Sequence, residues 1–230
     1  MTDAPLSTEN HGTETSDAGY ALWAVLRRNP QQNITPGDLQ IAVDRVEAEG
    51  VVIRGFYDVS GLRSDADLMI WLHGAPPEKL QWALRELRRN KLISSLIPTW
   101  SAMGVHRDAE FNRSHVPGFL RGEHARDWLV VYPFDRSYDW YLLEEDDRKR
   151  MLADHGRKGA AYPSVVANTV AAFALGDYEW ILPMESDSLT DLVDMMRALR
   201  ATEARRHVRG EVPFYTGRRI QVTEIEEVLS

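Results

Sequence analysis

Cysteine is absent from the 230-residue sequence. The chain therefore has no disulfide, no thiolate zinc site, no iron–sulfur ligand and no cysteine nucleophile. A transition metal would have to be bound through histidine, carboxylate or tyrosine side chains. Catalytic or metal-binding residues must therefore belong to a small number of side-chain types.

Basic residues are fewer than acidic ones. The sequence has 27 Lys and Arg against 35 Asp and Glu, which gives a formal net charge of -8. This balance predicts that the protein does not bind nucleic acid. An anionic ligand would need arginine and lysine side chains gathered at one place in the fold.

Long hydrophobic runs are missing as well. No apolar stretch approaches the roughly 20 residues that a membrane-spanning helix needs, so no membrane span is expected. Residues 1–18 lack the basic region and the apolar core of a signal peptide. They are polar and are expected to form a disordered tail. The sequence therefore predicts a cytoplasmic protein.

The order of predicted elements occurs twice along the chain. In the first half, strands are expected over 20–28, 51–61 and 66–74, and helices over 35–50 and 76–92. In the second half, strands are expected over 127–136, 164–176 and 178–188, and helices over 144–156 and 189–207. Prolines stand at predicted helix starts and glycines at predicted element ends, namely Pro36, Pro76 and Pro77, and Gly50, Gly156 and Gly176.

This repetition predicts an α+β fold with two ferredoxin-like halves, of the dimeric α+β barrel type, with antiparallel sheets and flanking helices. Two such sheets can pack face to face or close into a barrel that hides their edges. The expected division is a disordered tail over 1–18, an N-terminal half over 19–112, a C-terminal half over 113–220 and a C-terminal tail over 221–230.

The strand expected over 127–136 has unusual residues on one face. Alternation along a strand places Trp128, Val130, Tyr132, Phe134 and Arg136 on the same side. One interpretation is an ordinary edge of the core, with the Tyr132 hydroxyl and Arg136 reaching solvent. The other is a wall that binds an anionic ligand, because the planar guanidinium group of arginine can grip both oxygens of a carboxylate.

His155 lies at the predicted end of the helix over 144–156. Met151 and Leu152 precede it by four and three residues, so its imidazole falls on the apolar face. It is either a terminal histidine stabilised by the helix dipole or a neutral metal ligand. Because the sequence around it has no second histidine or glutamate at ligand spacing, a single protein ligand is expected, and that suits haem.

The next predicted strand has small side chains on one face. This face comprises Val166, Asn168, Val170, Ala172 and Ala174. Small residues leave room for a flat ligand, although a closely packed helix would need the same room. The strand is therefore compatible with a porphyrin site without requiring one.

Four segments together resemble the coproheme decarboxylases of the chlorite-dismutase-like superfamily, in particular the actinobacterial type. They are "VYPFDRSYDWYLL", "LADHG", "ANTVAAFALGDYEW" and "MRALRATEARRHV…EVPFYTG", within a resemblance that runs from Tyr20 to Gly217. The resemblance implies two ferredoxin-like halves, a homopentamer and a porphyrin bound in the C-terminal half. It also implies a hydrogen-peroxide-dependent enzyme that converts iron-coproporphyrin III to haem b by removing two propionates as CO₂.

The resemblance assigns roles to three residues near the iron. His155 corresponds to the proximal iron ligand, and Tyr132 to the catalytic tyrosine that becomes a radical and attacks the propionate. His115 lies where actinobacterial members have a distal histidine that takes a proton from peroxide. No metal besides the porphyrin iron is implied, and a coproporphyrin ferrochelatase is implied as a transient partner.

The resemblance also implies a substrate-binding set. Arg136 corresponds to the basic residue beside the propionates, and Trp140 and Trp180 to tryptophans near the pocket. Asn168 stands where other branches have a distal glutamine, whereas true chlorite dismutases have a distal arginine. This departure weakens the chlorite dismutase interpretation. Three further histidines match no family position and are expected to be surface residues: His73, His106 and His124.

Other functions remain open at this point. A haem or porphyrin carrier would need His155 and Arg136 but would have no use for Tyr132 or His115. A haem peroxidase or chlorite dismutase would need an open distal side with a charged group. A duplicated ferredoxin-like domain could also serve as an assembly module without haem.

Overall fold

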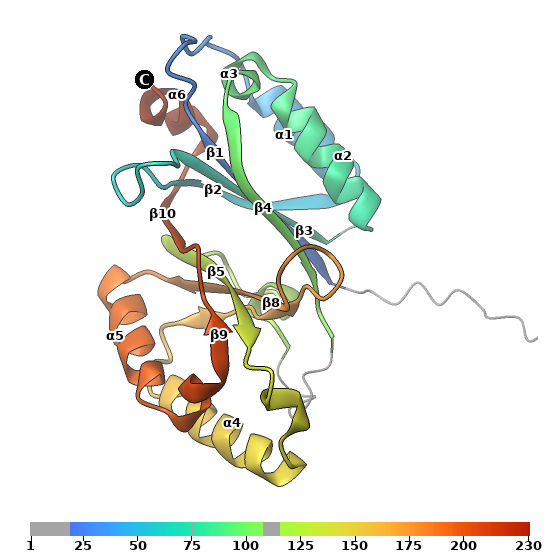
Figure 1. Cartoon of the computed structure of the whole chain (residues 1–230). Helices are drawn as coiled ribbons and strands as arrows, with labels where there is room; N and C mark the ends of the chain where they lie inside the picture. Colours follow the sequence, from blue (N-terminus) through green and yellow to red (C-terminus); the bar gives the residue numbers. More distant parts are fainter. Residues whose placement is uncertain (1–18, 75, 108–115) are drawn as a thin grey trace, which may run out of the picture.

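The computed structural model describes residues 19–74, 76–107 and 116–230 (Figure 1). Its strands form one antiparallel sheet in the order β6-β8-β7-β4-β1-β3-β2-β10-β5-β9, and β8 also pairs with β5. This extra pairing closes the strands from β8 round to β5 into an eight-stranded barrel. Closure removes the free sheet edges, and β6 and β9 extend the sheet beside it. The predicted α+β barrel class is confirmed.

The first half follows the predicted order and adds one strand. Its elements are β1 (Tyr20–Arg27), α1 (Gln40–Ala48), β2 (Val51–Asp58), β3 (Leu68–Gly74), α2 (Pro77–Arg88), α3 (Lys91–Ser94) and β4 (Ile97–Val105). The sequence did not predict β4, which pairs with β1 along its whole length. Helix α1 starts at Gln40 instead of near Pro36, because the Asp38 carboxylate accepts a hydrogen bond from the Gln40 amide and forms a turn before the helix.

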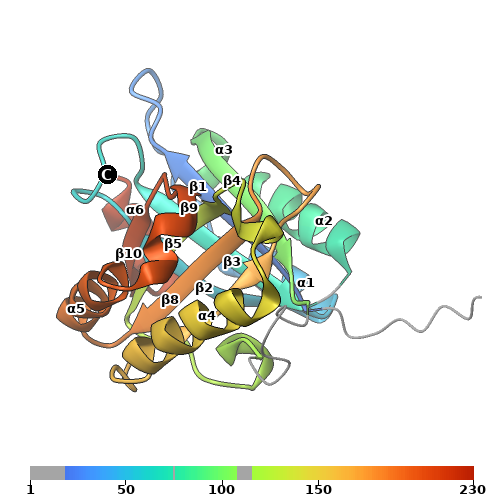
Figure 2. The ribbon, with the colours of Figure 1, turned by 60° about the horizontal axis from the view of Figure 1, so that its bottom comes forward.

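The second half contains the elements that surround the pocket described below. They are η1 (Gly118–Leu120), β5 (Trp128–Arg136), η2 (Trp140–Leu142), α4 (Glu145–Gly159), β6 (Val166–Ala167), β7 (Val170–Ala171), β8 (Trp180–Ser186), α5 (Leu189–Arg200), η3 (Glu203–His207), β9 (Val208–Gly210), β10 (Tyr215–Ile220), η4 (Val222–Glu224) and α6 (Ile225–Val228). Figure 2 shows α4 in front of β8, with α5 beside it.

Three sequence predictions for this half need correction. Helix α4 continues through Gly156 to Gly159, so His155 lies one turn inside the helix. The strand expected over 164–176 is broken into β6 and β7 around Asn168, whose side chain bonds to other segments. The residues expected as a tail over 221–230 form η4 and α6, because Ile225 and Leu229 are fully buried.

The core has separate layers inside and outside the barrel. The interior is rich in large aromatic residues such as Trp23, Tyr57 and Trp71. On the outside, α1 and α2 cover one part of the sheet, and α4 and α5 cover the part that contains β5 and β8 (Figure 1). Strand β10 pairs with β2 and β5, so the two halves share one continuous sheet. No helix in the described ranges is long and apolar enough to cross a membrane.

Candidate active site

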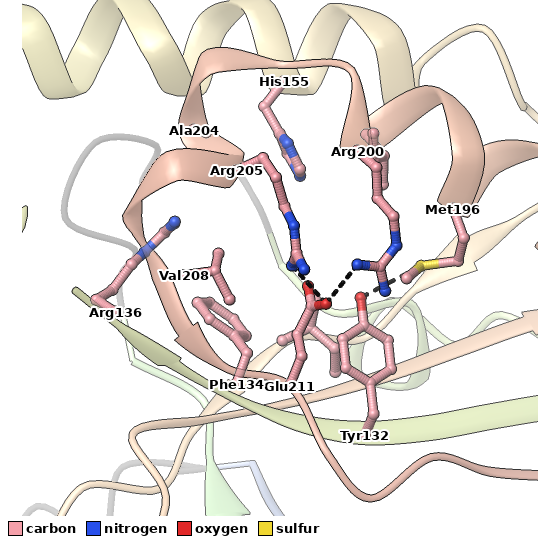
Figure 3. Close-up of a pocket in the computed structure, with 12 residues that line it drawn as sticks. Tyr132, Phe134, Arg136, His155, Met196, Arg200, Ala204, Arg205, Val208 and Glu211 are labelled. Carbon is pink, nitrogen blue, oxygen red and sulfur yellow. Dashed lines mark hydrogen bonds and ion pairs between the residues drawn. The ribbon is translucent and has the colours of Figure 1, made fainter.

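A pocket of about 60 Å³ lies between the outer face of β5 and the helices α4 and α5 (Figure 3). The two sides of the pocket come from different elements, with strand residues below and helical residues above. Its lining residues are Tyr132, Phe134, Arg136, His155, Leu182, Met196, Leu199, Arg200, Ala204, Arg205, Val208 and Glu211. Three candidates that the sequence analysis singled out, Tyr132, Arg136 and His155, are therefore brought together.

Tyr132 lies on the face of β5 that alternation predicts. Its ring stacks on Phe214 with centroids 4.3 Å apart, and its side chain is 3% exposed. The hydroxyl donates to Met196 Sδ at 3.5 Å. Burial raises the pKa of the Tyr132 phenol, and the negative charge of Glu211 raises it further. The phenol therefore keeps its proton at neutral pH.

The imidazole of His155 points from α4 into the pocket (Figure 3). Its Nδ1 lies 3.3 Å from Thr202 Oγ1, and the Thr202 hydroxyl donates its proton to Leu199 O at 2.8 Å. Thr202 therefore accepts from Nδ1–H, which leaves the Nε2 lone pair for a ligand. Burial lowers the pKa of His155, and the positive charge of Arg136 lowers it further. The site thus offers a neutral, oriented imidazole.

Arg136 is positioned by aromatic rings at the end of β5. Its guanidinium carbon lies 4.1 Å from the Trp140 ring centroid and 4.9 Å from that of Phe134. Trp140 is buried beneath it, against Met151 of α4. Trp180 stacks on the Phe134 ring with centroids 6.2 Å apart. Trp140 and Trp180 thus lie next to pocket-lining residues, and neither is among the described residues that form the lining.

Asn168 lies away from this pocket. It is fully buried, its Oδ1 accepts from the Phe119 amide at 2.9 Å, and its Nδ2 donates to Glu185 Oε2 at 3.2 Å. Glu185 in turn pairs with Arg54 of β2 at 2.6 Å, with both side chains out of solvent. The structure therefore places Asn168 in a buried polar network that connects β2, β8 and the segment around Phe119.

The other histidines differ in position. His115 lies outside the described residues. His73 was expected at the surface, and this expectation is wrong, since the side chain is 8% exposed and packs against Phe119 with ring centroids 4.9 Å apart. Burial lowers the pKa of His73 to about 4, and Arg54 contributes to the shift. His106 is partly exposed, and His124 is exposed.

Three charged pocket residues were not singled out from the sequence. Arg200 Nη1 and Arg205 Nη1 lie 2.9 Å and 2.5 Å from Glu211 Oε2. Arg200 ends α5, Arg205 lies in η3, and Glu211 follows β9. They fall inside segments that carry the family resemblance, but nothing in their spacing shows that the three side chains meet. Their pocket position required the tertiary structure.

A closed barrel built from two ferredoxin-like halves defines a dimeric α+β barrel protein. Within that class, the chain belongs to the chlorite dismutase family, whose profile matches residues 34–220. The chain is 54% identical to the coproheme decarboxylase of Mycolicibacterium smegmatis over 180 residues. The matched region covers 78% of each chain.

Solved structures of the same family have the same fold. Chlorite dismutase from Candidatus Nitrospira defluvii in complex with imidazole is 21% identical, with a TM-score of 0.77, over 93% of this chain and 96% of that one. A mutant of that protein in complex with cyanide is 20% identical, with a TM-score of 0.75, over 94% of this chain and 97% of that one. The likeness to these two structures establishes the fold.

Proposed function

We propose that this protein is a coproheme decarboxylase, which removes two propionates of iron-coproporphyrin III in a hydrogen-peroxide-dependent reaction and forms haem b, the last step of coproporphyrin-dependent haem biosynthesis. The observation that carries the proposal is that Tyr132, Arg136 and His155 line one pocket. The 54% identity to a coproheme decarboxylase supports it.

The side chains of the pocket fit such a substrate. His155 presents a neutral imidazole whose Nε2 can ligate the porphyrin iron, and Thr202 holds the ring through Nδ1. Arg136, supported by the Trp140 ring, can hold a propionate carboxylate. When bound, the iron porphyrin supplies the redox chemistry with peroxide, and the protein supplies orientation and proton transfer.

Tyr132 is the residue that we propose reacts with the propionate. Loss of one electron and one proton converts its phenol to a radical, which abstracts a hydrogen atom from the β-carbon of the side chain. Loss of a second electron and cleavage of the bond to the carboxylate then leave a vinyl group and CO₂. One peroxide accepts the two electrons per propionate and, together with protons, becomes two water molecules. A second round removes the second propionate.

His115 is the proposed base for peroxide. A neutral imidazole near neutral pH is suited to accept a proton from the incoming oxidant. The proposal for His115 rests on the family resemblance, because this residue lies outside the described part of the chain. Trp140 and Trp180 are proposed to contribute to substrate binding through the rings that contact Arg136 and Phe134. Asn168 lies away from the pocket in a buried network with Glu185, so its proposed part in substrate binding rests on the family resemblance alone.

The assembly and the partners are also proposed from the resemblance. We infer a homo-oligomer, the homopentamer that the family resemblance implies, located in the cytoplasm. Its substrate would come from a coproporphyrin ferrochelatase through transient contact. Native mass spectrometry of the purified protein measures the number of subunits directly, and a monomer would contradict this inference.

The function is tested by anaerobic loading with iron-coproporphyrin III, followed by stepwise addition of peroxide. Mass spectrometry should show successive loss of two carboxyl groups and formation of haem b. A carrier would return the substrate unchanged, and a chlorite dismutase would instead release O₂ when chlorite is added. Either outcome, without decarboxylation, would contradict the proposed activity.

A further inference from the structure

The Glu211 carboxylate pairs with two of the arginines that line the pocket, Arg200 and Arg205. Its side chain, 17% exposed, reaches up from the segment after β9 and ends between the guanidinium groups of Arg200 and Arg205 (Figure 3). All three residues line the same pocket as Tyr132 and His155. A carboxylate of the protein itself therefore lies where an anionic ligand would find two arginines.

The contact has the proximity of an ion pair without the geometry of strong hydrogen bonds. Glu211 Oε2 lies within 2.9 Å of both Nη1 atoms, yet neither Glu211 Oε2 nor Arg205 Nη1 makes a hydrogen bond of acceptable angle within the described residues. Arginine binds carboxylates best through two parallel N–H···O bonds. A carboxylate on a bound ligand can approach in that arrangement, which gives it an advantage over Glu211.

The size of the pocket also requires that something move. Its volume of about 60 Å³ is well below the roughly 300–1,000 Å³ of typical small-molecule sites. Glu211 and its two arginines connect the strand side to α5 and η3, so they help to hold the two sides together. Separation of Glu211 from the two arginines would release the strand side from α5 and η3 and make room for a bulky ligand.

We propose that Glu211 is a specificity-determining residue, a carboxylate placeholder that a propionate of the substrate displaces from Arg200 and Arg205. This inference rests on the proposed function for the identity of the ligand. Glu211 and its two arginines lie on the Tyr132 side of the pocket, where their charges act on the Tyr132 phenol. The propionate that replaces Glu211 is therefore one of those that the reaction removes.

The exchange favours binding of the substrate over binding of the product. A substrate propionate competes with Glu211 for the arginines, whereas the product carries a neutral vinyl group at that position and cannot compete. Glu211 then returns to Arg200 and Arg205 and draws the two sides of the pocket together. The same residue would thus disfavour porphyrins that lack the reactive propionates and would favour release of the product.

Binding of metal-free porphyrins tests the exchange independently of catalysis. Fluorescence titrations would compare coproporphyrin III with protoporphyrin IX, in which vinyl groups replace two propionates. Glu211→Gln removes the competing charge at nearly constant shape, so its dissociation constant for coproporphyrin III should fall on the order of tenfold, the change that about 1.4 kcal/mol makes. Its dissociation constant for protoporphyrin IX should not fall.

Glu203→Gln is the matched control. Glu203 pairs with Arg150 at 2.6 Å on the outer surface and does not line the pocket. Its loss should leave both dissociation constants unchanged. If Glu211→Gln does not fold, Glu211→Asp withdraws the carboxylate by one methylene and should shift coproporphyrin III binding in the same direction, by less.

Two results would overturn the exchange. One is an unchanged or weaker affinity of Glu211→Gln for coproporphyrin III, and the other is an equal gain for both porphyrins. The decarboxylation assay distinguishes the exchange from the proposed function. If wild-type protein converts iron-coproporphyrin III but Glu211→Gln binds coproporphyrin III no more tightly, the exchange alone is refuted. Tighter, selective binding without CO₂ release from wild-type protein would refute the proposed function alone.

Discussion

His155 on α4 and Tyr132 on β5 lie on opposite sides of one pocket (Figure 3). The helix side provides a neutral imidazole oriented by Thr202, and the strand side provides a protonated phenol. A flat ligand held between them would have an iron ligand on one face and, on the other, a phenol that can be oxidised to a radical.

His155→Ala should fold but hold the porphyrin iron weakly. Among the described residues, the His155 side chain makes one hydrogen bond, to Thr202, so little stability is lost. The spectrum of a five-coordinate, histidine-ligated iron porphyrin should disappear. Resonance Raman spectroscopy provides the test, and an unchanged iron–histidine stretch would place the ligand elsewhere.

Tyr132→Phe should bind iron-coproporphyrin III and fail to decarboxylate it. Phenylalanine keeps the ring that stacks on Phe214, and only the hydrogen bond to Met196 is lost, which costs at most about 0.5–1.5 kcal/mol. Binding should survive because Arg136 and His155 remain. Measurement of CO₂ release decides the matter, and release of both CO₂ molecules at the wild-type rate would refute the radical mechanism.

His115→Ala should bind substrate normally but need more peroxide or a higher pH. A positioned general base typically contributes roughly 10²–10⁴-fold in rate, and this is the expected loss. Steady-state peroxide kinetics measure this loss in rate between about pH 6 and 8, the range in which histidine titrates. Equal turnover of variant and wild type across that range would remove His115 from the mechanism.

His73 should make the protein less stable in acid. Its pKa is about 4 in the folded protein against 6.5 for the ordinary side chain, so the unfolded chain binds this proton first as pH falls. Stability from this group is fully present above about pH 6.5 and decreases towards pH 4, by about 3 kcal/mol in all. Urea unfolding at several pH values should show a shallower loss for His73→Gln. An identical pH dependence would contradict the assignment.

The sequence predicted the parts of the site that depend on local periodicity. Alternation along one strand placed Tyr132 and Arg136 on the same face, and helical spacing placed His155 with Met151. The surface expectation for His73 failed: it rested only on the lack of a matching family position, whereas β3 is buried on both faces. The sequence also could not reveal the contact of Glu211 with Arg200, which depends on how η3 and β9 fold back onto α5.

The strand and helix predictions failed for related reasons. Strand β4 was missed, although it pairs with β1 along its whole length, because its face pattern mixes polar and apolar residues. Helix α6 was missed because its apolar pattern, Ile225 and Leu229 with Val222 and Val228, is short and adjoins the end of the sequence given. Both elements depend on partners that lie far away in the sequence.

The buried pair of Arg54 and Glu185 should be important for stability when one partner is lost. Its atoms lie 2.6 Å apart with 6% and 0% of the side chains exposed, and Asn168 and the Glu123 carbonyl complete the network. Glu185→Gln would leave the Arg54 charge buried without its counter-ion, which typically costs about 3–5 kcal/mol.

A double replacement provides the control for this prediction. Because burial of two charges costs nearly as much as their attraction returns, Arg54→Met with Glu185→Leu should recover most of the stability that Glu185→Gln alone loses. The exposed pair of Arg197 and Asp194, 3.6 Å apart, gives the surface comparison, and Asp194→Asn should have no measurable effect. Urea unfolding measures all three proteins. A double variant less stable than Glu185→Gln would show that the network stabilises the barrel through its hydrogen bonds to Asn168 and Glu123, beyond the pairing of its charges.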